Sequence, residues 1–156
     1  MNWTKLLASI AACQLAGFVG SLFTRPAIPS WYAQLQKPWF APPNWLFAPM
    51  WISLYLLMAV AAYLVWNKGL ESKGVGTALA VFLFQLLLNA LWSPVFFGLR
   101  SPLAGAVVIV VLWLAILATI MVFTKISWPA AWLLVPYILW VSLATALNIS
   151  IYFLNR

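Results

Sequence analysis

The feature that most constrains this chain is a series of five apolar runs, each close to the length that crosses a bilayer. A helix needs about 20 apolar residues to span the hydrocarbon core of a membrane. Within lipid, only helices and closed barrels satisfy their own backbone hydrogen bonds, and runs of this length favour helices. The sequence therefore predicts an all-α membrane protein, a bundle of five transmembrane helices in a single domain, 1–156, with helices at about residues 6–24, 45–66, 76–98, 102–124 and 129–153.

The few charged residues lie between these runs. The chain is 67% hydrophobic and 6% charged, and so few charges could not solvate a soluble domain of this size. The net charge of +7 comes from eight Lys and Arg against one acid, and each cation falls at a break where it can sit among lipid head groups. This spacing favours a multi-pass membrane protein over a nucleic-acid binder. The cations divide four and four between the two predicted faces, so they indicate no orientation.

The first break, residues 25–44, differs from an ordinary loop. Long connections in compact proteins are usually functional lids or disordered segments. Rigid prolines together with large rings favour a structured lid over a loop that merely rests in the membrane interface. The break contains both kinds of residue: Pro26, Pro29, Trp31, Tyr32, Pro38, Trp39, Phe40, Pro42 and Pro43. We therefore predict a structured lid over one end of the bundle.

The inventory of reactive side chains is too small for most enzyme chemistry. The chain has no His, a single acid, Glu71, and a single cysteine, Cys13. Neither a metal site of the usual ligands nor a catalytic triad or carboxylate pair can be assembled from them. We expect no metal, no required cofactor and no acid–base catalysis.

Polar and aromatic residues inside the apolar runs are the candidate binding groups. At helical spacing they form one face on each of the second, third and fifth runs: Trp51, Tyr55, Met58 and Ala62; Gln85, Asn89, Trp92 and Phe96; Tyr137, Val141, Ala144 and Asn148, flanked by Trp140. Three such faces would enclose an aromatic pocket, and the prolines inside these runs would open space between the helices. Side-chain packing and interhelical hydrogen bonds explain the same pattern, so periodicity alone leaves both interpretations open.

Several motifs together resemble the translocator protein and tryptophan-rich sensory protein family (TspO/MBR). The segment 31–43, WYAQLQKPWFAPP, resembles the first loop of that family. The resemblance continues along the later runs, through Pro49, Trp51, Gln85, Asn89, Trp92, Ser93, Pro94, Phe96, Phe97, Pro136, Tyr137 and Trp140. The resemblance covers nearly the whole chain, and the sequence resembles bacterial-type members in particular.

This resemblance implies a five-helix bundle, commonly a homodimer, in a bacterial membrane, inner or outer. It also implies a pocket beneath the first loop that binds porphyrins and other apolar ligands, such as sterols or benzodiazepine-type compounds. Carried over by position, and with Phe96 added from the face of the third run, the ligand-binding residues are Tyr32, Pro42, Trp51, Gln85, Asn89, Trp92, Phe96, Tyr137, Trp140 and Ala144.

The leading functional interpretation is a membrane receptor or sensor that regulates tetrapyrrole metabolism or a stress response. One alternative is a transporter of porphyrin or sterol, although no internal repeat or coupling-ion site supports it. Another is light-dependent porphyrin breakdown, for which the resemblance implies Trp51 and Trp140 as electron or radical partners. A loose sterol-contact pattern near the C-terminus is formed by Leu147, Tyr152 and Arg156.

Overall fold

The computed structural model describes all 156 residues and contains helices without strands. Five stretches are long and apolar enough to cross a membrane, which confirms the predicted fold class. The elements in chain order are α1 (Trp3–Ala27), η1 (Ile28–Tyr32), α2 (Asn44–Trp66), α3 (Val75–Ser93), η2 (Pro94–Gly98), α4 (Pro102–Thr124), α5 (Trp128–Leu133) and α6 (Val135–Leu154), where η1 and η2 are short π-helical segments.

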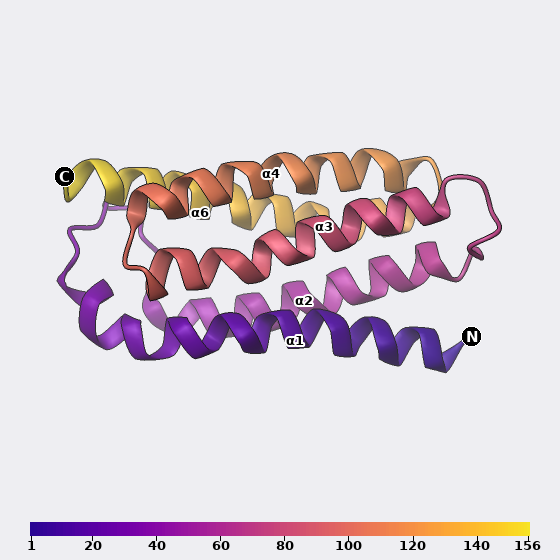
Figure 1. The fold of residues 1–156 in the computed structure, drawn as a ribbon, viewed down its shortest axis with the longest axis horizontal. Helices are drawn as coiled ribbons and strands as arrows, with labels where there is room; N and C mark the ends of the chain where they lie inside the picture. The colour runs from indigo at the N-terminus through magenta and orange to yellow at the C-terminus, as the bar shows by residue number, and fades with distance from the viewer.

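The helices form a closed ring whose order differs from their order in the chain (Figure 1). The first helix, α1, packs against both α2 and α3, and α4 packs against both α3 and α6. The ring closes where α5 contacts α2. The short connection 99–101 makes α3 and α4 antiparallel neighbours, because so few residues cannot reach any distant element.

Prolines interrupt two of the predicted helices. The third run was predicted as one helix to residue 98, but from Pro94 onward it is the π-helical η2. The fifth run, predicted as one helix over 129–153, is instead divided at Leu134 into α5 and α6, two residues before Pro136. The physical reason is the same in both, since proline has no N–H to donate and its ring clashes with the carbonyl four residues earlier.

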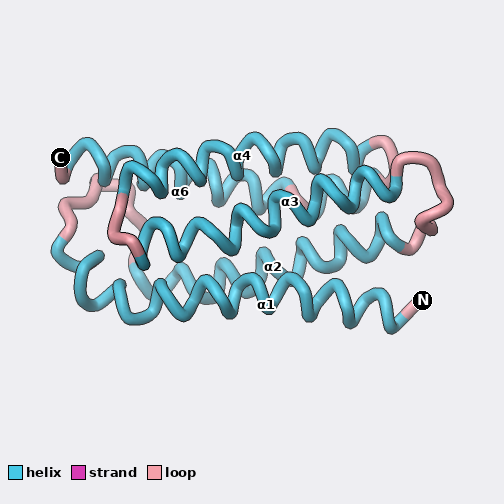
Figure 2. The backbone as a smooth tube through the Cα atoms, in the orientation of Figure 1, coloured by secondary structure: helices cyan, strands magenta, loops and turns pink.

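The first helix runs further than predicted, so the irregular part of the lid is shorter. Helix α1 was expected to end at residue 24, but it continues to Ala27 and then through η1 to Tyr32. The non-helical lid is residues 35–43, which cross the end of the bundle that also holds the C-terminus (Figure 2). The lid is held there by a reciprocal pair of hydrogen bonds: Gln36 N donates to Asn155 Oδ1 at 2.9 Å, and Asn155 Nδ2 donates to Gln36 O at 2.9 Å.

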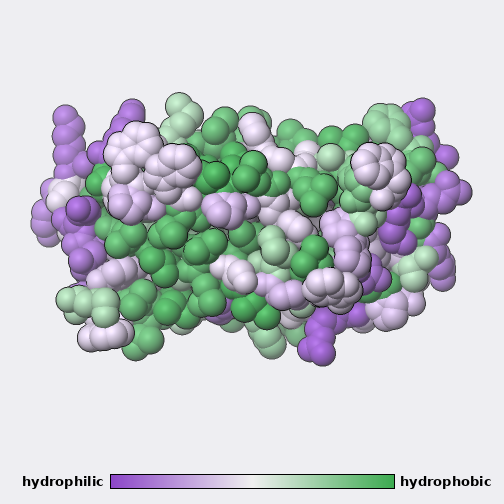
Figure 3. Space-filling view, turned by 180° about the vertical axis from the view of Figure 1, so that it is seen from behind, coloured by the Kyte–Doolittle hydropathy of each residue, from purple (hydrophilic) through white to green (hydrophobic).

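The surface is an apolar band between two hydrophilic ends (Figure 3). Large apolar side chains such as Leu7, Phe18 and Leu87 are more than half exposed, as lipid-facing residues are in a single chain. The end that carries the lid holds Arg25, Lys37, Arg100 and Arg156, and the opposite end holds Lys5, Lys68, Glu71, Lys73 and Lys125. The chain is therefore a multi-pass integral membrane protein.

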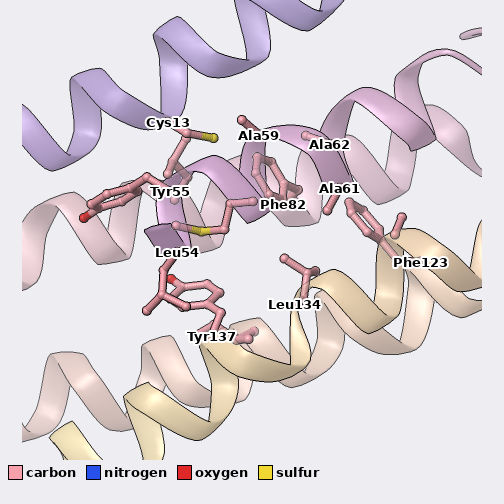
Figure 4. Close-up of a cluster of buried hydrophobic side chains, with 14 of the residues drawn as sticks. Cys13, Leu54, Tyr55, Ala59, Ala61, Ala62, Phe82, Phe123, Leu134 and Tyr137 are labelled. Carbon is pink, nitrogen blue, oxygen red and sulfur yellow. The ribbon is translucent and has the colours of Figure 1, made fainter. Parts of the chain in front are cut away.

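The main buried core draws side chains from all five membrane spans, and Figure 4 shows part of it. Cys13 points from α1 toward α2, and Phe82 stacks on Phe123 with ring centroids 5.9 Å apart. Helices α1 and α2 approach closely because residue 17 is glycine: a Cβ there would lie 2.5 Å from Cε2 of Tyr55. Small residues permit such contact between membrane helices.

Candidate functional site

A cavity of about 640 Å³ lies between α1, α2 and α3, in the half of the bundle beneath the lid. Three predicted binding residues share its wall: Trp51 from α2, and Asn89 and Trp92 from α3. Ligand pockets in proteins usually measure about 300–1,000 Å³ and combine apolar rings with a few polar groups. The cavity has the size and the lining of such a pocket.

The wall supplied by α1 did not appear among the predicted site residues. Gln14, Gly17, Ser21, Thr24 and Arg25 all line the cavity. Gln14, Gly17, Ser21 and Thr24 follow one another at intervals of three or four residues, with Arg25 next to Thr24, so they lie on one face of the helix. That spacing of small and polar residues within an apolar run is a usable sequence signal, because a polar group at membrane depth needs a partner or a cavity.

Behind the cavity, Tyr55 and three predicted binding residues form a buried hydrogen-bond network that joins α2, α3 and α6. The Tyr55 hydroxyl donates to Asn89 Oδ1, and Asn89 Nδ2 donates to the Tyr137 hydroxyl at 2.7 Å. The Tyr137 hydroxyl in turn donates to Gln85 Oε1 at 2.8 Å. Gln85 and Tyr137 have no exposed surface. Interhelical bonding, one of the two interpretations left open above, therefore accounts for Gln85 and Tyr137, while Asn89 serves both the network and the cavity wall.

Trp92 is fixed in place from both sides. Its Nε1 donates to Asn148 Oδ1 at 3.0 Å, while Asn148 Nδ2 donates to the carbonyl oxygen of Pro102 at 2.7 Å. Its ring stacks on that of Phe96, with centroids 5.1 Å apart and planes 16° apart. The edge of the cavity is therefore a rigid indole, held by α4 and α6.

A second, much smaller hollow of about 20 Å³ lies directly under the lid. Tyr32, Phe96 and Ala144, all predicted binding residues, line it. Phe47, Trp92 and Phe97 line both this hollow and the large cavity, so their rings lie between the two spaces. The hollow is about the size of one water molecule, so Tyr32, Phe96 and Ala144 meet a ligand only if one of these rings moves.

Two predicted residues bury a polar atom that has no partner. They are the hydroxyl of Tyr32, a residue that is 3% exposed, and Nε1 of Trp140, a residue that is 8% exposed. The Trp140 ring packs against Phe47 with centroids 5.9 Å apart. An unsatisfied buried donor costs about 1–3 kcal/mol. Neither donor has a partner within the protein; Tyr32 lines the small hollow, whereas Trp140 lines neither space.

The remaining predicted residues are not brought together. Pro42 is half-buried in the lid and lines neither hollow. In the sterol-contact pattern, Leu147 is buried under the lid, Tyr152 packs on Phe153, and Arg156 is exposed over the same Phe153 ring. Tyr152 and Arg156 thus share a contact with Phe153, whereas Leu147 lies apart from them in the buried cluster under the lid.

Comparison with known proteins agrees with this architecture. The sequence profile of the TspO/MBR family matches residues 9–154. The chain is 46% identical to the "Tryptophan-rich protein TspO" of Archaeoglobus fulgidus over 155 residues, which are 99% of each chain. It is 40% identical to the "Tryptophan-rich sensory protein" of Cereibacter sphaeroides, over 99% of this chain and 94% of that one. It is 37% identical to the human "Translocator protein", over 96% of this chain and 89% of that one. The chain therefore belongs to the TspO/MBR family.

Proposed function

We propose that the protein is a membrane receptor that binds flat, apolar ligands, tetrapyrroles such as porphyrins foremost, in the cavity between α1, α2 and α3. The observation that carries this proposal is the aromatic wall of the cavity. Trp51 and Trp92 face one space of about 640 Å³ together with the amide of Asn89. Large rings supply apolar area and stacking surfaces to a flat ligand.

The unpartnered donors beneath the lid support an extension of the same site. A ligand that displaces Phe47 would reach the hydroxyl of Tyr32 and Nε1 of Trp140, and an acceptor on the ligand would satisfy them. Such a ligand would be held by the lid as well as by the cavity. Sterols and benzodiazepine-type compounds, which have apolar rings and few acceptors, would fit the same description.

The name of the relative from Cereibacter sphaeroides, "Tryptophan-rich sensory protein", supports a sensory role. The proposed output of that sensor is regulation of tetrapyrrole metabolism or of a stress response. Binding in the cavity gives such a sensor its input, because the lid crosses the end of the same bundle and can report occupancy. Transport is the alternative that the name "Translocator protein" suggests. Transport would need a second state, since the network of Tyr55, Asn89 and Tyr137 closes the deep end of the cavity.

The test of the binding proposal is quenching of intrinsic tryptophan fluorescence by protoporphyrin in detergent-purified protein. We expect saturable quenching, and Trp51→Ala should weaken the affinity about ten-fold, which corresponds to about 1.4 kcal/mol. The matched control is Trp132→Ala, which removes an exposed indole outside the cavity and should leave the affinity unchanged. Unsaturable quenching in all forms, or equal affinity in both variants, would contradict the proposal.

A further inference from the structure

The cavity contains one charged side chain and no carboxylate. Arg25 is the only charged residue among the 18 that line it. The remaining polar groups of the wall are neutral, and the amide of Asn89 is already engaged on both atoms by Tyr55 and Tyr137. Arg25 is therefore the strongest polar recognition group that the cavity offers.

No acidic residue is near enough to neutralise Arg25. The single acid of the chain, Glu71, lies in the loop 67–74 at the opposite end of the bundle. At the lid end the other charged residues are Lys37, Arg100 and Arg156, all cations. Arg25 is exposed in the last turn of α1, and no acidic side chain of the protein pairs with it.

The two ends of the cavity differ in charge, because Arg25 lies at only one of them. Arg25 lies in the last turn of α1, at the membrane edge, while Gln14 marks the deep end of the same wall. The two residues are separated by three helical turns, about 17 Å along the helix axis. Between them the cavity is bounded by the rings of Phe47, Trp51 and Trp92. The lining is thus aromatic along its length and cationic at the end nearest the lid.

Resting on the binding function proposed above, we propose that the natural ligand is an amphipathic anion whose apolar body lies among these rings and whose acidic group binds the guanidinium of Arg25. A guanidinium presents a planar fork of donors that matches a carboxylate or a phosphate. With its acidic group beside Arg25, at the end nearest the lid, the ligand keeps this group near water. Its apolar body then lies within the membrane-spanning part of the bundle. A carboxylated ligand and a phospholipid share this chemistry, and the experiment distinguishes them.

The experiment compares acids with their neutral esters. Two probe pairs are titrated against purified protein in detergent: protoporphyrin and its dimethyl ester, and a pyrene-labelled long-chain fatty acid and its methyl ester. We expect the wild type to prefer each acid, and Arg25→Gln to weaken acid binding about five-fold while it leaves ester binding unchanged, because the guanidinium is partly exposed to solvent. The matched control is Arg100→Gln, which removes a cation from the same end of the bundle but outside the cavity.

The outcomes separate this proposal from the binding function. Equal acid and ester affinities in the wild type, or the same acid preference in wild type and Arg25→Gln, would overturn the role of Arg25 even if porphyrin binds. If protoporphyrin fails to saturate but the fatty acid shows the Arg25-dependent preference, the anion proposal stands and the tetrapyrrole proposal fails. Native mass spectrometry decides the source of the anion: a co-purified phospholipid that is lost in Arg25→Gln would assign the bilayer as that source.

Discussion

At the scale of single residues, the hydroxyl of Tyr137 links two helices in the interior of the bundle. It accepts from Asn89 Nδ2 and donates to Gln85 Oε1, so one atom joins α6 to two positions of α3. Both amides are buried at membrane depth, away from water. An amide that loses its hydrogen-bond partner there cannot bond to water instead, so the loss destabilises the fold. The network therefore specifies how α6 meets α3.

We expect Tyr137→Phe to destabilise the fold by about 1–2 kcal/mol, because two interhelical hydrogen bonds are lost and such bonds in membranes average about 0.6 kcal/mol each, with a maximum near 1.7. The measurement is the free energy of unfolding in detergent. Tyr152→Phe is the control, since it removes the same hydroxyl from a half-buried ring outside the network. Equal stabilities of the two variants would show that the network contributes nothing.

Gly17 makes a second residue-scale prediction. Its Cβ in Gly17→Ala would lie 2.5 Å from Tyr55 Cε2, so the ring must move or α1 must separate from α2. We expect a loss of about 1–3 kcal/mol, typical of overpacking. Gly76→Ala, at a helical glycine with no atom within 4 Å of the added Cβ, should instead be neutral or stabilise by up to about 1 kcal/mol. Thermal unfolding of the two variants tests the contrast, and a shift in the same direction for both would contradict it.

Helical periodicity predicts which residues share a face, but not which of them meets the cavity. Asn89 and Trp92 lie one turn apart on α3, and the structure brings both to the cavity with Trp51. Gln85 shares their face but is turned toward Tyr137 and Met58, so it is wholly buried. Which residue of a face meets a cavity depends on the neighbouring helix, and a single sequence does not contain that information.

At the scale of elements, the lid and the C-terminal helix act as one unit. The reciprocal hydrogen bonds between Gln36 and Asn155 join the non-helical lid to the end of α6. Lys37 adds a cation–π contact, with Nζ 4.6 Å from the centroid of the Tyr32 ring. The ordering of the lid therefore depends on residues at both ends of the chain.

We expect Asn155→Ala to loosen the lid without unfolding the bundle, because it removes the side-chain partner of both backbone groups of Gln36. Hydrogen exchange of residues 35–43 should become faster, while exchange in α3 and α4 should not change. Asn67→Ala, at the opposite end of the bundle, is the control. Unchanged exchange in the lid would show that other contacts hold it.

The extent of each element could be predicted only as far as apolar length decides it. The span α4, Pro102–Thr124, matches its predicted limits because Ser101 caps it and Pro102 starts it. The first helix was predicted to stop near Arg25, but helical geometry continues through Pro26 and Pro29 to Tyr32. From the sequence, these prolines predict the start of a loop. Here they are accommodated by a π-helical turn, which sequence periodicity does not indicate.

At the scale of the whole molecule, five spans close into a ring around a buried core. Cys13 lies inside it at 1% exposure, although it belongs to the first helix of the chain. Two features stay predictions from the resemblance: that the protein forms a homodimer, and that it lies in a bacterial membrane.

The burial of Cys13 predicts a clean folding reporter. We expect the thiol to resist maleimide labelling in the folded protein and to react as the bundle unfolds in denaturant, with a midpoint equal to that of helix loss measured by circular dichroism. A cysteine introduced as Ser72→Cys, in the exposed loop 67–74, should react under all conditions. Rapid labelling of Cys13 in the native protein would contradict the close packing of α1 against α2.

The order of helices around the ring bears on how the chain is made. Because α6 completes the ring, Gln85 and Asn89 emerge from the ribosome and enter the membrane well before Tyr137 is synthesised. Until the last helix arrives, both amides need temporary partners, from lipid head groups, the insertion machinery or each other. A chain that terminates before Tyr137 would leave the amides of Gln85 and Asn89 without their final partner. These unpaired polar groups within the bilayer would distinguish an unfinished protein from a complete one.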